Sequence, residues 1–373
     1  MQFTCLQENL EKGLTTVSKA VSARSPLPIL ANVLIVTEDG RLKLTASNTE
    51  TSITCYVGAS VDADGSITLP AKILGEFVSH LSPTNIDFKL DGAIMHVKAG
   101  KTKSKFNGVA SSSYPELPEI TGSSSVITLD PQVFSDALSH VAFSAALDDT
   151  RPILSGILLD YKKGVLTVVS ADGFRLSEKV LKVESDLDSF SVVIPAKTLI
   201  EVGRIFSKAG EPIKFVISES NNMALFESDE VTVSTRILEG SFPDYKKLIP
   251  SDTVLSAEFG VEELLEAVKL TNVFAKNKEG SHSPITVLFS PEGHLKVTSI
   301  SQETGENHSE IEAEVTGDEL SVVFNSRFLL DLLNNIKSDR LVFSTNGELT
   351  PGIVRAAGDS DFVHLIMPIR NQD

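Results

Sequence analysis

The chain has 373 residues and a formal net charge of −17 at neutral pH. Hydrophobic residues make up 41% of it and Trp is absent, so any core must rest mainly on Leu, Ile, Val and Phe. This length allows two or three domains, and the acidic balance argues against a protein that grips nucleic acid with a large basic surface.

The sequence also indicates in which cellular compartment the protein should be found. Two cysteines, Cys5 and Cys55, are too few for a disulfide framework, so we expect two buried thiols in a reducing cytoplasm. No apolar run approaches the roughly 20 residues that a membrane-spanning helix needs. The first residues, "MQFTCLQENL", lack the basic and apolar regions of a secretory signal. We therefore expect a cytoplasmic protein with no membrane partner.

Helical patterns recur along the chain, and three of them begin alike. They are "LPAKILGEFVSHL" at 69–81, "IPAKTLIEVGRIF" at 194–206 and "FNSRFLLDLLNNI" at 324–336. Each has a basic residue at its fourth position and an acidic residue four positions later. A second helical pattern precedes each of them. We predict six helices, at 8–24, 70–83, 131–147, 195–210, 262–278 and 325–340.

The segments between these helices alternate apolar and polar residues with period two, which is typical of half-buried antiparallel strands. The repeat recurs at spacings of 125 and 130 residues, which fits a domain better than a solenoid unit. We predict three domains, at 1–120, 125–250 and 253–373, joined by segments rich in Ser and Pro. Each should contain two βαβββ-like halves, which gives an α+β fold with helices on one face of antiparallel sheets.

No motif in the sequence indicates catalysis. There is no phosphate-binding glycine loop, no metal-ligand spacing of His and Cys, and no nucleophile elbow. Paired carboxylates at Asp148–Asp149 and Glu262–Glu263 are best interpreted as solvated or helix N-terminal charges. We expect a non-enzyme with no cofactor and no metal. A hydrolase or transferase with a site between domains remains an alternative, because active sites are assembled in space.

The charges are distributed unevenly. The six predicted helices together carry +3, so the rest of the chain carries −20. If the helices share one surface, that surface is neutral to basic on an acidic body. Such a surface could face phosphates without gripping them, although a chance distribution is the alternative.

Four segments, in order along the whole chain, carry a family resemblance. They are "RSPLPILANVLI" (24–35), "ADGFRLS" (171–177), "GSFPDYKKLIP" (240–250) and "HLIMPIR" (364–370). They resemble signature segments of the bacterial sliding clamps, the β subunits of the replicative DNA polymerase.

The resemblance implies a head-to-tail dimer that forms a six-domain ring, with helices lining the hole and sheets forming the wall. Such a ring encircles duplex DNA without regard to sequence and tethers its partners through a peptide-binding groove. The implied partners are a clamp loader, replicative and other DNA polymerases, and repair proteins carrying clamp-binding peptides. The alternative is a non-catalytic peptide-binding scaffold unrelated to DNA.

The resemblance also assigns the groove, between the second and third domains. Leu154, Leu176 and Leu248 could instead be plain core, and Asp172–Gly173 a plain turn. A polarisable Met would help a shared docking site adapt to varied peptides. The groove residues are Leu154, Ala171, Gly173, Phe174, Arg175, Leu176, Pro243, Lys247, Leu248, Asn325, Phe328, Leu365 and Met367.

Two further sets of residues are predicted. By resemblance, Arg24, Lys72 and Lys197 face DNA, and we add Arg204, Lys208 and Arg327 from helix position and charge; a solvated helix face is the alternative for each. At the dimer interface the resemblance implies apolar contacts by Phe106, Val273 and Phe274, with Lys103 and Lys105 near Glu303 and Glu306 of the other copy.

The sequence departs from the family pattern at three groove positions. Ala171 stands where Thr is usual, Phe174 where His is frequent, and Lys247 where Arg is frequent. The chain also continues past Arg370 with "NQD". These departures could change which peptide side chains the groove prefers.

Overall fold

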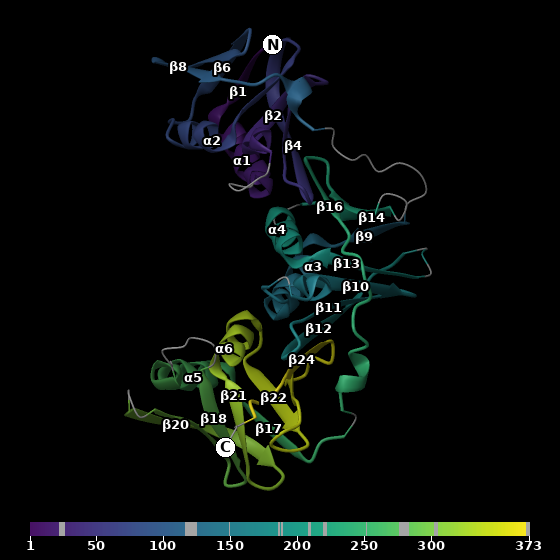
Figure 1. Ribbon diagram of the computed structural model, residues 1–373, viewed down its shortest axis with the longest axis vertical. Coiled ribbons are helices and arrows are strands. Elements are labelled where there is room, and N and C mark those ends of the chain that lie inside the picture. The colour runs from purple at the N-terminus through teal and green to yellow at the C-terminus, as the bar shows by residue number, and fades with distance from the viewer. Residues whose placement is uncertain are drawn as a thin grey trace. The chain divides into compact units, whose positions relative to one another are not determined.

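The computed structural model describes residues 1–21, 27–115, 125–148, 150–185, 187, 189–207, 210–218, 222–250, 252–275, 283–301 and 305–370. The chain divides into two compact units (Figure 1). Unit 1 comprises Met1–Gln132 and Arg204–Ile237, and unit 2 comprises Val133–Gly203 and Leu238–Asp373. Each unit is described by itself.

One pattern, a strand, a helix and three strands, occurs six times in the described part of the chain. This order confirms the predicted βαβββ halves. The first two copies are β1 (Gln2–Leu6), α1 (Gln7–Val17), β2 (Asn32–Glu38), β3 (Arg41–Ser47), β4 (Thr51–Ala63), and β5 (Ser66–Pro70), α2 (Ala71–Ser79), β6 (Asn85–Asp91), β7 (Ile94–Ala99), β8 (Thr102–Asn107).

The middle two copies are β9 (Ser125–Leu129), α3 (Pro131–Val141), β10 (Gly156–Lys162), β11 (Val165–Ala171), β12 (Arg175–Lys182), and β13 (Ser189–Pro195), α4 (Ala196–Phe206), β14 (Ile213–Ser218), β15 (Met223–Glu227), β16 (Val231–Arg236). The last two are β17 (Leu255–Gly260), α5 (Val261–Ala275), β18 (Pro284–Ser290), β19 (His294–Ser301), β20 (Gly305–Thr316), and β21 (Leu320–Asn325), α6 (Ser326–Asn335), β22 (Arg340–Thr345), β23 (Gly352–Ala356), β24 (Phe362–Ile366).

The strand pairings among the described residues are all antiparallel, as the period-two alternation predicts. In unit 1 the sheet runs β8-β7-β6-β1-β4-β16-β15-β14-β9, with β2, β3 and β5 joined through β4. In unit 2 it runs β13-β10-β11-β12-β24-β23-β22-β17-β20-β19-β18-β21. Each sheet therefore continues from one predicted domain into the next, through β4–β16 and through β12–β24.

The helices lie at the predicted places, and two of them end earlier than predicted within the described residues. The helix predicted for 325–340 ends at Asn335, because Ile336 is extended (φ −85°, ψ 136°) and buries its side chain. The helix predicted for 131–147 ends at Val141, and Ala142–Ser144 form a 3₁₀ turn before Ala145 becomes extended. Tertiary packing sets these ends, whereas the apolar pattern continues past them.

Each helix buries one stripe against its sheet. In α6 the buried positions are Ser326, Leu329, Leu332 and Leu333, and in α2 they are Ala71, Leu74 and Val78. In unit 1, α1 packs on α2 and on β1, β3 and β4, and in unit 2, α5 packs on α6 and on β17–β20 (Figure 1). The opposite faces of these helices are left for solvent or for a ligand.

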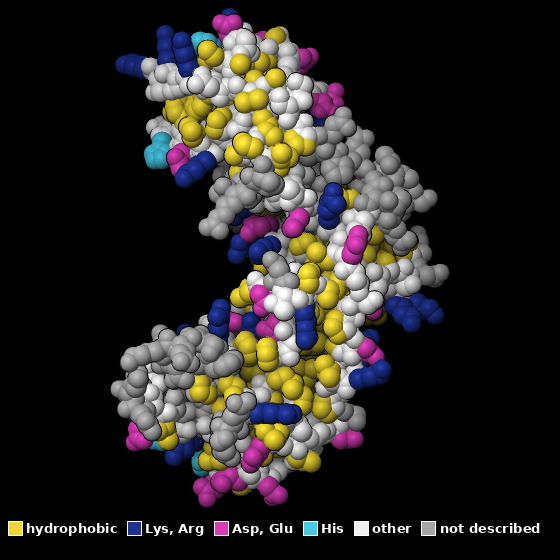
Figure 2. Space-filling view, viewed as in Figure 1, with side chains coloured by type: hydrophobic (Ala, Val, Ile, Leu, Met, Phe, Trp, Pro, Cys, Tyr) yellow, Lys and Arg dark blue, Asp and Glu magenta, His cyan; other side chains and the backbone are white. Residues whose placement is uncertain are grey.

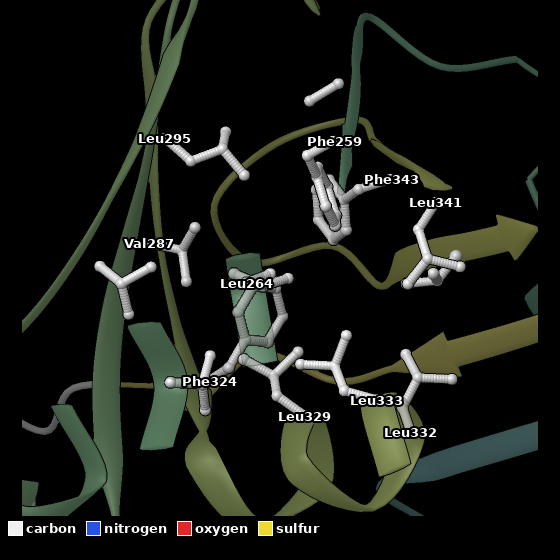
Figure 3. Close-up of a cluster of buried hydrophobic side chains, with 14 of the residues drawn as sticks. Phe259, Leu264, Val287, Leu295, Phe324, Leu329, Leu332, Leu333, Leu341 and Phe343 are labelled. Atoms are coloured by element: carbon white, nitrogen blue, oxygen red, sulfur yellow. The ribbon is translucent and has the colours of Figure 1, made fainter. Parts of the chain in front are cut away.

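The largest core cluster lies in unit 2 beneath α5 and α6 (Figure 3). The rings of Phe289 and Phe343 stack with centroids 4.6 Å apart, and Phe324 meets Phe343 edge-on at 5.8 Å. These side chains and their aliphatic neighbours enclose a cavity of about 20 Å³ whose lining is apolar. A void of this size and chemistry stays dry and is too small to be a ligand site.

Both cysteines are free and buried, which confirms the prediction of two unpaired thiols. Within the described ranges, no helix has the length and apolar character needed to cross a membrane.

Candidate functional site

The turn between β11 and β12 is built by Asp172. Its carboxylate accepts hydrogen bonds from the backbone N–H groups of Phe174 (2.8 Å) and Arg175 (3.0 Å). Gly173 supplies the positive φ of 94° that the turn requires, which favours glycine over residues with a side chain. The "ADGFRLS" segment therefore forms a rigid corner with Phe174 at its tip.

The Arg175 side chain points inward from this corner and has several partners. Its Nε donates to Asp172 Oδ2 (2.9 Å) and its Nη1 to Asp331 Oδ2 (2.6 Å) on α6. The guanidinium also lies over the rings of Phe328 (4.5 Å to the centroid) and Phe143 (5.8 Å). A side chain only 6% exposed needs these partners, because a buried unpaired charge is strongly destabilising.

Strand pairing brings the two signature segments "ADGFRLS" and "HLIMPIR" together. In the β12–β24 register, Leu176 faces Leu365 and Ser177 faces His364. Beyond the ladder, the backbone N–H of Met367 donates to the carbonyl of Phe174 at 2.8 Å. Residues separated by almost 190 positions thus share one surface.

The third signature segment, 240–250, is anchored by Tyr245. This side chain is buried, and its hydroxyl donates to the carboxylate of Glu178 on β12. Burial and this hydrogen bond raise the pKa of Tyr245, so the hydroxyl remains a donor. Tyr245 belongs to one apolar cluster with Leu154, Ala171, Leu176 and Leu365.

Large apolar side chains stay exposed at the edge of this cluster. Phe174 is 61% exposed, Leu248 57% and Met367 40%. Figure 2 shows hydrophobic side chains gathered over the part of unit 2 where Figure 1 labels β12 and β24. We call the combined set of buried and exposed residues the docking surface; it consists of Leu154, Ala171, Gly173, Phe174, Arg175, Leu176, Pro243, Lys247, Leu248, Asn325, Phe328, Leu365 and Met367.

The remaining predicted groove residues lie at the rim or at a helix start. Asn325 is buried and caps α6 by accepting a hydrogen bond from Arg327 N at 3.1 Å. Phe328 stacks on Phe174 with centroids 6.4 Å apart. Lys247 is exposed and pairs with Asp244 at 2.7 Å. Leu154 and Leu176 prove to be buried, so they support the surface from below, whereas Leu248 is exposed.

A buried histidine under this surface was not predicted. His364 donates or accepts at Nδ1 with Ser177 Oγ (2.9 Å), which in turn bonds Ser144 Oγ (2.8 Å), while its Nε2 has no partner among the described residues. Burial, and then the positive charge of Arg175, lower the pKa of His364 from 6.5 to about 3. The imidazole is therefore neutral at physiological pH.

The predicted DNA-facing residues fall on helix surfaces where the structure describes them. Lys72 on α2, Lys197 and Arg204 on α4, and Arg327 on α6 all have exposed side chains. Arg24 and Lys208 lie outside the described residues. Sequence reasoning did not single out Lys12 and Lys19. They line a hollow of about 640 Å³ together with Arg204 at the end of α4 and with two glutamates, Glu8 and Glu11. The spacing of seven residues between the two lysines, two helical turns, was the available signal.

The predicted dimer residues differ in exposure. Lys103 and Lys105 are exposed on β8, and Val273 on α5 is 61% exposed. Phe274 is half-buried, and Glu306 is exposed on β20, whereas Glu303 lies outside the described residues. Phe106 is only 8% exposed, because its ring packs edge-on against Phe77 of α2 at 5.3 Å. Its apolar surface is thus largely covered within its own chain.

The described part of the chain offers no metal site, since it contains no group of three or more His, Cys, Asp or Glu side chains suitably placed. Two strongly perturbed titratable groups of unit 2, His364 and Tyr245, are buried within hydrogen-bonded networks. The geometry is that of a surface for binding.

Comparisons with known proteins agree over the full length. Family models of the DNA polymerase III beta subunit match in sequence order: the N-terminal domain at residues 1–118, the central domain at 128–244 and the C-terminal domain at 246–370. The beta sliding clamp of Streptococcus pneumoniae serotype 4 is 31% identical, over 96% of this chain and 96% of the relative. That of Bacillus subtilis is 28% identical over 99% and 100%.

Solved structures give the same result. The sliding clamp from Bacillus subtilis superposes with a TM-score of 0.93 at 27% identity, covering 100% of this chain and 99% of that one. A Pseudomonas aeruginosa sliding clamp bound to griselimycin gives 0.92 at 28% identity, with complete coverage of both chains. The chain belongs to the family of DNA polymerase III beta subunits, the beta sliding clamps.

Proposed function

We propose that two copies of this chain close head to tail into a six-domain ring around duplex DNA, and that the docking surface tethers DNA polymerase to it. The chain is then a processivity factor and a non-catalytic accessory subunit. Full-length similarity to sliding clamps carries this proposal. Each of the three domains, with bounds near 1–120, 125–250 and 253–373, supplies two of the ring's βαβββ halves.

The charge of the helices supports a ring that slides. Lys72, Lys197 and Arg327 are exposed on three of the helices, while the chain as a whole carries −17. A few exposed cations attract the phosphates weakly, so they orient the duplex without holding one position. Retention then depends on enclosure, and the acidic remainder repels DNA from the outer wall.

Two strand edges support a closed dimer. Strand β8 ends its sheet, and β20 pairs with β19 through Gly305–Glu312 and with β17 only beyond that. Strand β8 carries Lys103 and Lys105, and the exposed residues of β20 include Glu306 and Glu310. Antiparallel pairing between these edges would extend the sheet and oppose unlike charges. The exposed Val273 would be covered by the same contact.

The docking surface supports tethering by short peptides. Phe174, Leu248 and Met367 offer exposed apolar contacts on segments that hydrogen bonds hold in place. Apolar anchors on a rigid, partly polar surface suit an extended peptide. The partners we propose are a second copy of the chain, duplex DNA, a clamp loader, replicative and other DNA polymerases, and repair proteins with clamp-binding peptides, in the cytoplasm.

Retention on circular DNA tests the proposal. The protein is loaded onto nicked circular DNA by a clamp loader, and the complex is isolated and washed with 1 M salt, at which phosphate contacts are screened within about 3 Å. Retention on the circle with release after linearisation supports a ring. Equal loss from circles and linear DNA contradicts it. If the same protein still binds clamp-binding peptides, the peptide-binding scaffold becomes the better hypothesis.

A further inference from the structure

Two turns of this chain, one in each unit, share the same hydrogen-bonded backbone. In the β3–β4 turn, Asn48 Oδ1 accepts from the backbone N–H groups of Glu50 and Thr51, both at 2.8 Å. In the β11–β12 turn, Asp172 Oδ1 accepts from the residues two and three positions after it, at 2.8 and 3.0 Å. Each acceptor residue also donates its own N–H to the carbonyl of the third residue after it, at 2.9 and 3.2 Å respectively. The corner that carries the docking surface is therefore built twice.

The strand beside each turn is attached in the same way (Figure 1). The N–H of Arg236 donates to the carbonyl of Glu50 at 3.0 Å, and the N–H of Met367 donates to that of Phe174 at 2.8 Å. We call residues 47–52 and 234–236 the first corner, and residues 171–176 and 365–367 the second corner.

Two buried supporting side chains recur as well. Leu30 lies in a 3₁₀ turn before β2 (Pro28–Ala31) and Leu154 in a 3₁₀ turn before β10 (Pro152–Ser155), and each is 3% exposed. Tyr114 follows β8 as Tyr245 follows β16, and both are buried. The corners thus share their backbone and these supports, so a difference in binding must come from the other side chains.

The buried side chains of the two corners differ in polarity. In the β4–β16 register Ser52 faces Ser234, whereas in the β12–β24 register Leu176 faces Leu365. All four are buried. Ser52 Oγ also shares a hydrogen bond with Ser47 Oγ at 2.7 Å, so the first corner offers a peptide less apolar area from below.

The exposed side chains at the tips differ more. In the second corner Phe174 and Met367 supply exposed apolar contacts. At the matching positions the first corner exposes Glu50 and Arg236. An apolar peptide side chain placed there would take two charged groups out of water without supplying a partner for either one. Unpaired charges of this kind are one of the ways in which a surface rejects an unwanted ligand.

We propose that Glu50 and Arg236 are specificity-determining residues that keep clamp-binding peptides off the first corner, so that each chain tethers such a peptide at the second corner alone. The inference rests on the proposed tethering function and adds to it the reason why only one of two matching corners is used. A single tethering point in each chain fixes where a partner lies, whereas two points would divide the partner between two positions.

The test asks whether peptide binding can be transferred from one corner to the other in the full-length protein. The probe is a short fluorescein-labelled segment of the replicative DNA polymerase, chosen among overlapping segments as the one that the wild type binds most tightly. The variant Phe174→Glu/Met367→Arg gives the second corner the tips of the first. Adding Glu50→Phe/Arg236→Met gives the first corner the tips of the second. Fluorescence anisotropy should show weak binding in the double variant and binding about tenfold or more tighter in the quadruple variant.

Two further variants separate the charges from other causes. The matched control adds Glu8→Phe/Arg41→Met to the same double variant, which places the same two side chains at exposed positions of unit 1 outside the first corner, and it should not restore binding. The variant Phe174→Gln/Met367→Gln removes the apolar tips of the second corner without adding charge. It should bind the probe about tenfold or more tightly than the charged double variant does.

Three results would overturn this inference while the wild type still binds the probe. One is a quadruple variant that binds no more tightly than the double variant. Another is an equal gain in the matched control, which would indicate unspecific apolar binding. The third is equal affinity of the uncharged and charged variants of the second corner, which would leave no role for charge. Failure of every polymerase segment to bind the wild type would instead overturn the proposed tethering function, and this inference with it.

Discussion

Arg175 Nη1 donates to Asp331 Oδ2 across 2.6 Å, although the two residues are 156 positions apart in the sequence. The bond joins β12, in the predicted second domain, to α6, in the third. Two more ion pairs in unit 2 span the same predicted boundary, Lys179–Asp359 at 2.7 Å and Lys337–Asp136 at 2.6 Å. Arg175 is the most buried of the three cations, so we infer that its pair fixes this junction most firmly.

Substitution of Arg175 by Ala is expected to lower the free energy of unfolding by about 3 kcal/mol or more, because it breaks a buried ion pair and removes the packing between Phe328 and Phe143. Urea unfolding followed by circular dichroism measures the change. The control is Lys247→Gln, which removes an exposed pair with Asp244 and should leave the free energy of unfolding almost unchanged. Equal losses for the two variants would show that Arg175 does not hold the junction.

The ion pair between Arg175 and Asp331 also bears on peptide docking. The variant Asp331→Asn keeps the shape of the side chain and removes its charge. If it lowers both the free energy of unfolding and the affinity for a clamp-binding peptide, the ion pair positions the docking surface. A loss of stability with unchanged peptide affinity would restrict Asp331 to a structural role.

Substitutions of Leu154 and Leu248 should distinguish a side chain that supports the docking surface from one that contacts the bound peptide. Leu154→Ala is expected to cost about 2–5 kcal/mol of stability, since the side chain is 3% exposed inside the apolar cluster. Leu248→Ala should change stability by about 0.5 kcal/mol or less, because its side chain is 57% exposed. It should instead weaken peptide binding, measured by fluorescence anisotropy. Full peptide affinity in Leu248→Ala would remove this residue from the surface.

The features that depend on short-range sequence pattern, namely the strands and helices, were predicted from the sequence. Period-two alternation and helical stripes are short-range signals, so the six βαβββ copies and the places of all six helices followed from them. The helix ends did not, because burial of Ile336 in extended conformation depends on the tertiary core of unit 2.

Contacts between residues far apart in the chain could not be predicted from the sequence pattern. Asp331 was noted as an acidic residue four positions after Arg327, a spacing that suggests a pair within one helix. In the structure Asp331 pairs with Arg175 from another domain. Phe106 was assigned to the dimer interface, and nothing in its own segment reveals that Phe77 covers its ring. The neutral His364 likewise depends on burial that β12–β24 pairing creates.

His364 should make the protein sensitive to acid. Its pKa is about 3 in the folded chain, lowered from 6.5 chiefly by burial, so below pH 6.5 the unfolded chain binds a proton that the folded chain does not. Stability is therefore lost as pH falls through 6.5 toward 3. Between pH 7.5 and pH 5 this one group should lower the free energy of unfolding by about 2 kcal/mol.

Urea unfolding of the wild type and His364→Leu at these two pH values measures the effect. The variant should lose about 2 kcal/mol less than the wild type on acidification, whatever its stability at pH 7.5. The control, His80→Gln, changes an exposed histidine and should keep the wild-type pH dependence. If the free energy of unfolding changes equally with pH in all three proteins, protonation of His364 is not coupled to unfolding.

Cys5 and Cys55 should be unreactive while the chain is folded. Burial raises the pKa of the Cys5 thiol from 9.0 to about 12 and that of Cys55 to about 11, and Asp87 and Glu230 add to the respective shifts. Because the thiolate is the nucleophile, the folded protein at pH 8 should react with a chromogenic disulfide reagent far more slowly than a free thiol does. Both thiols should react rapidly in guanidinium chloride. Fast labelling of either cysteine in native buffer would mean that β1 or β4 opens readily, and protection of Cys55 alone would place that opening at β1.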